Sequence, residues 1–243
     1  FQPVVRISDG VVVGAEALAR IRAESGDLLL PDQFIDVAED TGLIADLGSQ
    51  VLSIALNRLG KWNTSSKNPL NMAVNVSARQ LSDPAFPEVI RSALSENNLD
   101  SSLVALEFTE SALIVANPVT GRVLEELTAL GVQIGLDDFG TGFSSLAYLK
   151  RFPINFLKID RSFMSGLGTS DDDTAIVTGT IALAHSLDLE VVAEGVETET
   201  QLTQLNKLKC NFAQGFHFSE PVTDAEFDRF VNRTFDPSEV STN

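Results

Sequence analysis

Short apolar runs alternate with helical patterns along almost the whole 243-residue chain. Each run is rich in β-branched residues and is bounded by turn or helix signals, which is typical of a buried strand. Regular alternation of strands and helices indicates a parallel sheet covered by helices. The expected strands are residues 1–7, 11–18, 72–76, 103–108, 132–137, 155–159, 189–194 and 211–215, and the expected helices are about 32–40, 45–62, 84–95, 117–130, 145–151, 172–187, 199–208 and 223–233.

The first two strands are joined differently from the others. Only the turn sequence Ser8-Asp9-Gly10 separates them, so we expect an antiparallel hairpin. Eight strands at this length favour a closed barrel over an open dinucleotide-binding sheet, which would need a GxGxxG motif after its first strand. We therefore predict an α/β barrel with an antiparallel first strand in one domain, residues 1–233, and a frayed tail at 234–243. Because the chain begins inside a predicted strand, we expect it to be part of a longer protein.

Polar side chains recur where the predicted strands end. In a barrel of this kind the carboxyl ends of the strands meet at one rim, and active sites lie there. Carboxylate and amide oxygens at such a rim suit hard divalent cations, which can in turn hold a phosphate. The residues concerned are Glu16, Asn75, Glu107, Asp137, Asp138, Lys158, Asp160, Glu194 and Gln214.

Composition narrows the kind of site. The net charge is −17, the reverse of the balance found in nucleic-acid grooves, so we expect no DNA partner. Two histidines and one cysteine are too few for a typical zinc site, which favours Mg²⁺ or Mn²⁺. No apolar stretch is long enough to cross a bilayer. The single Cys210 fits a reducing compartment, so we expect a cytoplasmic domain, even if the full-length protein is membrane-anchored.

Two of these features have simpler interpretations. Adjacent strand residues point to opposite faces, so Asp137 and Asp138 reach one site only where their strand ends and bends. An isolated pair of this kind would more often be a helix cap and a solvated acid, but carboxylates at five strand ends argue against that. Lys158 either forms a structural salt bridge with Asp160 or another rim acid, or positions a water for catalysis. The residues alone leave both roles of Lys158 open.

Seven motifs taken together resemble one known family. They are EALAR, NVSARQL, EFTES, DDFGTGFSSL, FLKIDRSF, VVAEGVET and QGFHFSEP, in this order. The chain is similar over about residues 1–230 to the EAL family of cyclic di-GMP phosphodiesterases. The resemblance implies a modified TIM (β/α)8 barrel with an antiparallel first strand and two Mg²⁺ or Mn²⁺ ions per site. It further implies hydrolysis of cyclic di-GMP to linear pGpG, a homodimer, and upstream sensory or GGDEF-type domains in the full-length protein.

The resemblance also implies roles for individual residues. One metal ion would be bound by Glu16, Asn75, Glu107 and Asp137, and a second by Asp138, with Glu194 and Gln214 completing the metal shells or their water network. Lys158 would hold or activate the attacking water, with Glu194 and Glu197 assisting catalysis. Glu110 would brace the loop 138–146, which couples dimerisation to metal binding. The dinucleotide would be held by Gln2, Leu18, Arg20 and Asp160.

The chain departs from the family pattern at three positions. Ala19 and Ile21 stand where Leu and Trp are frequent, and Glu220 stands where a basic residue is frequent. A negative charge at residue 220 is expected to weaken binding of an anionic ligand rather than to alter the chemistry. Two other functions fit the same barrel, namely a cyclic di-GMP sensor without activity and a protein-interaction scaffold. The intact set of metal-binding motifs favours the enzyme over both.

Overall fold

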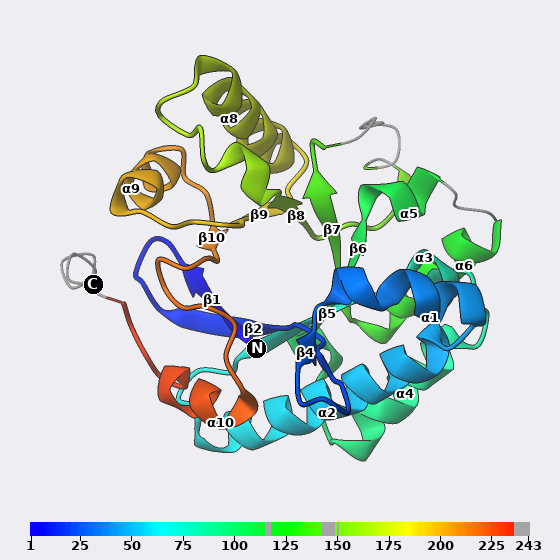
Figure 1. The fold of residues 1–243 in the computed structure, drawn as a ribbon. Helices are drawn as coiled ribbons and strands as arrows, with labels where there is room; N and C mark the ends of the chain where they lie inside the picture. Colours follow the sequence, from blue (N-terminus) through cyan, green and yellow to red (C-terminus); the bar gives the residue numbers. More distant parts are fainter. Residues whose placement is uncertain (115–117, 142–148, 150, 236–243) are drawn as a thin grey trace.

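The chain forms a closed eight-stranded barrel surrounded by helices (Figure 1). This computed structural model describes residues 1–114, 118–141, 149 and 151–235. Around the barrel the strands follow the order β1-β10-β9-β8-β7-β6-β5-β2. Their bounds are β1 Gln2–Arg6, β2 Val12–Ala17, β5 Asn71–Asn75, β6 Val104–Thr109, β7 Gln133–Phe139, β8 Phe156–Ile159, β9 Glu190–Ala193 and β10 Phe212–Ala213. The predicted barrel is confirmed.

The helices pack on the outside of the barrel. Their bounds are α1 Ile35–Thr41, α2 Ile44–Ser65, α3 Ala78–Leu81, α4 Phe86–Glu96, α5 Glu110–Ile114, α6 Pro118–Leu130, α8 Asp171–Ser186, α9 Glu199–Lys207 and α10 Asp224–Phe227. Short 3-10 turns lie at Pro31–Gln33, Ser101–Leu103, Arg161–Phe163 and Asp228–Phe230. In the described part of the chain no helix is both long and apolar enough to cross a membrane.

Strand β1 is antiparallel to both of its neighbours, β2 and β10, whereas the other neighbouring pairs are parallel. The short turn after β1 reverses the chain, as predicted from the sequence. Gln2 consequently lies beside Glu16 in the ladder. The amino-terminal end of β1 therefore meets the carboxyl ends of the other strands at one rim.

The two faces of the strands bury different residues. Outward-facing residues such as Leu106, Leu136 and Leu157 belong to the large core between barrel and helices. A second, small core lies inside the barrel, separate from the first. It consists of Ala73, Ala105, Phe156 and Val192, with Val4 and Phe212 packed against them.

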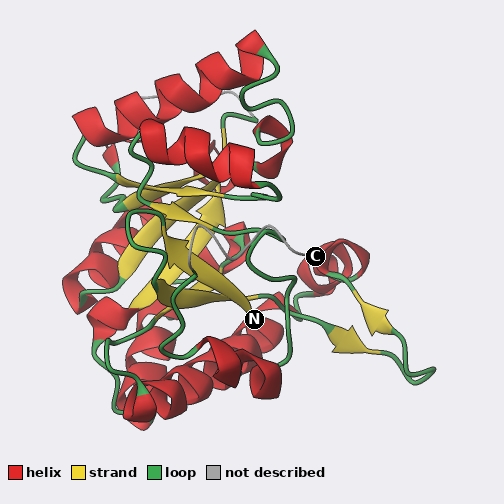
Figure 2. Cartoon of the chain, turned by 90° about the vertical axis from the view of Figure 1, so that its left-hand side faces the viewer, coloured by secondary structure: helices red, strands yellow, loops and turns green. Residues whose placement is uncertain are grey.

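Two short strands and two short helices were not predicted from the sequence. Strands β3 (Ile21–Arg22) and β4 (Leu28–Leu29) form a hairpin that extends away from the barrel (Figure 2). Helices α3 and α5 are short; two residues separate α3 from the end of β5, and α5 follows β6 directly. Two-residue strands and one-turn helices are too short for hydrophobic periodicity to reveal them.

Several helix and domain limits differ from the prediction. Helix α4 begins at Phe86, because Asp83 Oδ1 accepts from the Ala85 N–H in a turn instead of capping a helix at residue 84. The last predicted helix, 223–233, is the short α10 followed by a 3-10 turn. Most of the predicted helix 145–151 lies outside the described residues. Thr234 pairs with Val11 and Phe235 is buried, so the packed chain reaches Phe235. The remaining predicted tail, 236–243, lies outside the described residues.

Candidate metal and active site

Lys158 on β8 lies at the centre of four carboxylates. Its Nζ atom is 2.6 Å from Glu194 Oε1 and 2.8 Å from Glu107 Oε2. The same atom is 3.2 Å from Glu16 Oε2 and 3.3 Å from Asp137 Oδ2. The Lys158 side chain is 1% exposed. Glu16, Glu107 and Asp137 lie in the strands β2, β6 and β7, and Glu194 directly follows β9. Their carboxylates converge on this ammonium group at the rim, as predicted from the sequence.

Glu16 is fixed by two amide side chains. Asn75 Nδ2 donates to Glu16 Oε1 over 2.7 Å, and Gln214 Nε2 donates to Glu16 Oε2 over 2.7 Å. Gln214 Nε2 also donates to Gln2 Oε1, and Gln2 Nε2 donates to the Ser219 carbonyl. The antiparallel β1 thus contributes Gln2 to the same rim. The Ser219 contact was not predicted, since a backbone carbonyl leaves no signal in side-chain patterns.

Asp137 and Asp138 occupy an irregular end of β7. The ladder to β8 shifts register between Leu136 and Phe139, and Asp138 has a positive φ of 55°. Non-glycine residues rarely adopt this conformation, although aspartate does so more easily than most. The bulge allows consecutive carboxylates to serve one region, which a regular strand would prevent. The bend that the sequence argument required is therefore present.

The cluster holds more negative than positive charge. Four carboxylates surround one ammonium group, a formal excess of three negative charges before Asp138 is counted. Burial raises the pKa of Glu107 well above its usual value, and burial raises the pKa of Glu194 to about 7. Burial, followed by the charges of Asp137 and Asp160, raises the pKa of Asp138. These carboxyl groups resist ionising together unless further positive charge is present.

The pKa shifts of Lys158 and Glu16 favour their charged forms, whereas the raised pKa of Glu107 favours its neutral form. Burial alone would lower the pKa of Lys158, but the surrounding carboxylates, Glu107 foremost, raise it well above 10.5. Burial alone would raise the pKa of Glu16, but Lys158 and the two amide donors lower it overall. Lys158 is therefore an ammonium ion and Glu16 a carboxylate in this arrangement.

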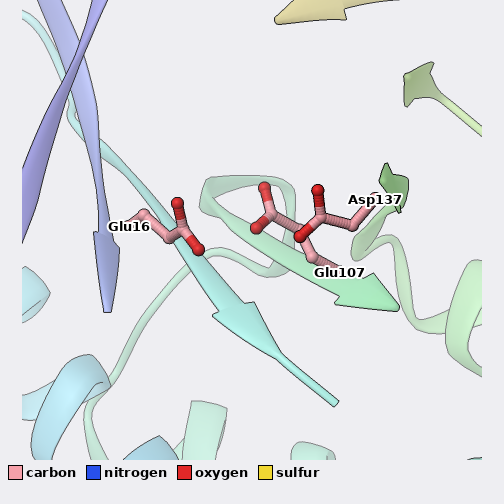
Figure 3. Close-up of side chains that lie close together, drawn as sticks. All are labelled: Glu16, Glu107 and Asp137. Atoms are coloured by element: carbon pink, nitrogen blue, oxygen red, sulfur yellow. The ribbon is translucent and has the colours of Figure 1, made fainter. Parts of the chain in front are cut away.

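The donor set fits hard divalent cations. Carboxylate oxygens of Glu16, Glu107 and Asp137 lie within 4.8 Å of one another and point together (Figure 3). A second group, Asp137, Asp138 and Glu194, meets the same distance limit and shares Asp137 with the first. All the donors are oxygens, the ligand type that Mg²⁺ and Mn²⁺ prefer. A bound cation would also supply the positive charge that the cluster lacks.

Four other predicted site residues lie in the segments that follow β2, β8 and β9. Leu18 is half-buried directly after β2, and the exposed Arg20 donates to the Ala19 carbonyl. Asp160 follows β8, where it caps a 3-10 turn through the Ser162 N–H, and it forms none of the ion pairs with Lys158. Glu197 is exposed, and its backbone N–H donates to Gln201.

Glu110 is buried at the first position of α5, directly after β6. Its predicted partner, the loop 138–146, lies mostly outside the described residues. The roles expected for Glu110, Glu197 and the dinucleotide-binding residues therefore remain predictions.

Comparison with known proteins defines the class to which this barrel belongs. The EAL domain family model matches residues 1–221. The bifunctional diguanylate cyclase/cyclic di-GMP phosphodiesterase MucR of Pseudomonas aeruginosa is 43% identical over 222 residues, which cover 91% of this chain and 32% of that protein. The cyclic di-GMP phosphodiesterase NbdA of the same organism is 41% identical over 95% of this chain and 30% of its own length.

Solved structures agree with the sequence comparison. The PaMucR phosphodiesterase in complex with c-di-GMP has a TM-score of 0.88 and 42% identity, covering 93% of this chain and 92% of that chain. The EAL domain of Mycobacterium smegmatis DcpA has a TM-score of 0.79 and 34% identity, covering 95% of this chain and 93% of that chain. The chain therefore belongs to the EAL domain family. It spans about a third of the length of the curated relatives it matches.

Proposed function

We propose that this chain is a cyclic di-GMP phosphodiesterase that hydrolyses one phosphodiester bond of the ring to give linear pGpG. The observation that supports this most is the buried group of carboxylates around Lys158 at the rim of the barrel. Family membership and relatives named as cyclic di-GMP phosphodiesterases at 41% and 43% identity point to the same reaction.

The proposed cofactor is a pair of Mg²⁺ or Mn²⁺ ions. The two carboxylate groups share Asp137, so this residue would contribute to the binding of both ions. Glu16, Glu107 and Asp137 would hold one ion with Asn75, and Asp138 and Glu194 would hold the other. When bound, such ions lower the pKa of a water and neutralise charge on phosphate oxygens.

Lys158 has two roles in this proposal. Without metal ions its ammonium group is the cation that keeps four carboxylates together. With ions bound by these carboxylates, Lys158 would be free to donate hydrogen bonds to the attacking water. In the metal-free arrangement the surrounding carboxylates raise the pKa of Lys158, so its side chain is there a hydrogen-bond donor and a positive charge.

The rim residues outside the cluster would bind the substrate. Arg20, three residues after the end of β2, is exposed and carries a charge suited to a phosphate. Leu18 offers an apolar contact, and Gln2 and Asp160 offer hydrogen-bonding groups. In the whole protein we propose a homodimer, GGDEF-type or sensory domains upstream, and a cytoplasmic location for this domain.

The direct test is turnover of cyclic di-GMP by the purified chain, followed by chromatography of the nucleotide. We expect linear pGpG with Mg²⁺ or Mn²⁺, no product after chelation, and poor activity with Ca²⁺, which is larger and tolerates looser geometry. Isothermal titration in Mg²⁺ separates the alternatives. A sensor would bind cyclic di-GMP and return it intact, and a scaffold would not bind it. Either result would refute the proposal.

A further inference from the structure

The inside of the barrel changes character from one end to the other. Inward-facing residues at the rim are polar, as described above. Two positions further from the rim on each strand, the inward-facing residues are small or apolar, namely Val4, Gly14, Ala73, Ala105, Gly135, Phe156, Val192 and Phe212. We call these eight residues the apolar belt. At the opposite end of the barrel the interior is polar again, with Asn71, Gln133 and Glu190.

The apolar belt does not fill the barrel. Barrel interiors of this type are normally packed with bulky branched side chains. Here Gly14, Ala73 and Ala105 contribute almost no side-chain volume, and a cavity of about 320 Å³ remains. Neither glycine leaves a gap of its own, because the Asn71 carbonyl oxygen lies 2.7 Å from where a Cβ of Gly14 would be, and the Phe156 ring lies where a Cβ of Gly135 would be. Residues of all eight barrel strands line the cavity, and Ala73 and Ala105 are the smallest side chains among the belt residues of its wall.

The cavity has an apolar wall and a polar inner end. Val4, Val192 and Phe212 complete the wall, whereas Glu107 and Gln214 form the end nearest the rim. Gln214 Nε2 donates to Gln2 and Glu16, two acceptors, so the amide nitrogen must face them. The Oε1 atom of the same planar amide is buried and accepts no hydrogen bond within the described residues. A buried acceptor of this kind is costly unless a donor reaches it.

We propose that this cavity is a binding site for a compact, uncharged, largely apolar molecule with one hydrogen-bond donor. The wall would bury the apolar part, and Gln214 Oε1 would accept from the donor. The volume is about twice the roughly 150 Å³ that holds one benzene ring, so a two-ring molecule fits. Glu190 at the open end disfavours anions, which distinguishes this site from the proposed site for the dinucleotide at the rim.

Indole is a suitable probe, because it combines two apolar rings with one N–H. Titration calorimetry of indole into the metal-free chain should show saturable binding to one site. Indene has the same shape without the donor, and it should bind at least about tenfold more weakly because Gln214 Oε1 stays unpaired. No binding of indole, or equal binding of the two probes, would overturn the proposal.

Two variants locate the site. Ala73→Leu and Ala105→Leu each place a larger side chain in the apolar belt, and each should weaken indole binding tenfold or more without lowering the melting temperature. Ala182→Leu makes the same change on the exposed face of α8 and should bind indole as the original chain does. Unchanged binding in both belt variants would overturn the proposal.

If the belt variants do not fold, NMR of the original chain decides the question. Indole protons should show nuclear Overhauser contacts with the methyl groups of Ala73 and Ala105, and their absence in an indole-saturated sample would overturn the proposal. None of these measurements depends on hydrolysis of cyclic di-GMP. Failure of the proposed phosphodiesterase activity would therefore leave the result interpretable.

Discussion

On β7, two consecutive residues face different surroundings. Leu136 is 1% exposed and packs in the core between barrel and helices, whereas Asp137 faces the interior and lies 3.3 Å from Lys158. The same division holds for Leu106 and Glu107 on β6 and for Leu157 and Lys158 on β8. The outward face supplies apolar burial that stabilises the barrel. The inward face at the rim gathers like charges, which destabilise it but suit cation binding.

The largest expected difference between the two faces is the one between substitutions of Asp137, which faces inward, and Leu136, which faces outward on β7. Asp137→Ala should lower turnover by roughly 10²–10³-fold, the range for removing one electrostatic group from an active site. Its stability should not fall, because one negative charge leaves a crowded cluster. Leu136→Ala should cost about 2–5 kcal/mol of unfolding free energy, and the folded fraction should stay active. Urea unfolding and kcat on both variants measure this contrast, and equal destabilisation of the two would contradict it.

Lys158→Met tests whether one inward residue serves both stability and chemistry. Without metal ions the variant leaves four carboxylates with no buried cation, so its melting temperature should drop. Mg²⁺ should restore the melting temperature because the ions replace the missing charge. Turnover in saturating Mg²⁺ should still be about 10²-fold below that of the original chain, with cyclic di-GMP still bound. Restoration of both stability and turnover by Mg²⁺ would leave Lys158 a purely structural cation.

The outward face was largely predictable from the sequence, and the inward face only in part. Leu136 and Leu157 belong to continuous apolar runs, and such runs indicate buried strands whatever their exact register. Glu107 and Glu194 could be placed at the rim because every strand end in a barrel meets there. The partners of Lys158 could not be chosen from the sequence, since the pairing depends on which strands lie across the barrel.

Two features of the interior escaped the sequence argument for physical reasons. The cavity depends on Ala73 and Ala105 being small at the same depth of the barrel, and pattern analysis of single strands does not compare depth between strands. The contact between Gln2 and Gln214 joins the first strand of the barrel, β1, to the residue directly after the last strand, β10. It depends on β1 closing the barrel against β10, a pairing that only the three-dimensional fold establishes.

The pH dependence of stability should also separate the two faces. The pKa of Glu194 is about 7 in the folded chain and 4.5 is its ordinary value, so the folded state binds the proton more tightly. The stability that the folded chain gains from this tighter proton binding is fully present below pH 4.5 and is lost as the pH rises through 7. Glu107 acts in the same direction. The metal-free chain should therefore be less stable to urea at pH 8 than at pH 5.5, by a few kcal/mol at most.

Glu194→Gln is the control for this effect, because glutamine does not titrate and keeps the shape of the side chain. The variant should lose less stability between pH 5.5 and 8 than the original chain does. Leu136→Ala should lower stability by the same amount at both pH values, since the outward face carries no titrating group there. An identical pH dependence in Glu194→Gln and the original chain would exclude Glu194 as the source.

The smallest expected effect lies at the outer edge of the site. Glu220 is exposed and directly follows Ser219, whose carbonyl accepts from Gln2. Its charge would repel an anionic dinucleotide through solvent, so Glu220→Lys should lower KM for cyclic di-GMP by roughly two- to fivefold at low ionic strength. The decrease in KM should disappear near 1 M salt, where the Debye screening length is about 3 Å. The value of kcat should not change at either salt concentration. Glu226→Lys is the matched control, because Glu226 is also exposed but its carboxylate caps α10. An equal gain from both substitutions would trace the effect to net charge rather than to a position beside the rim.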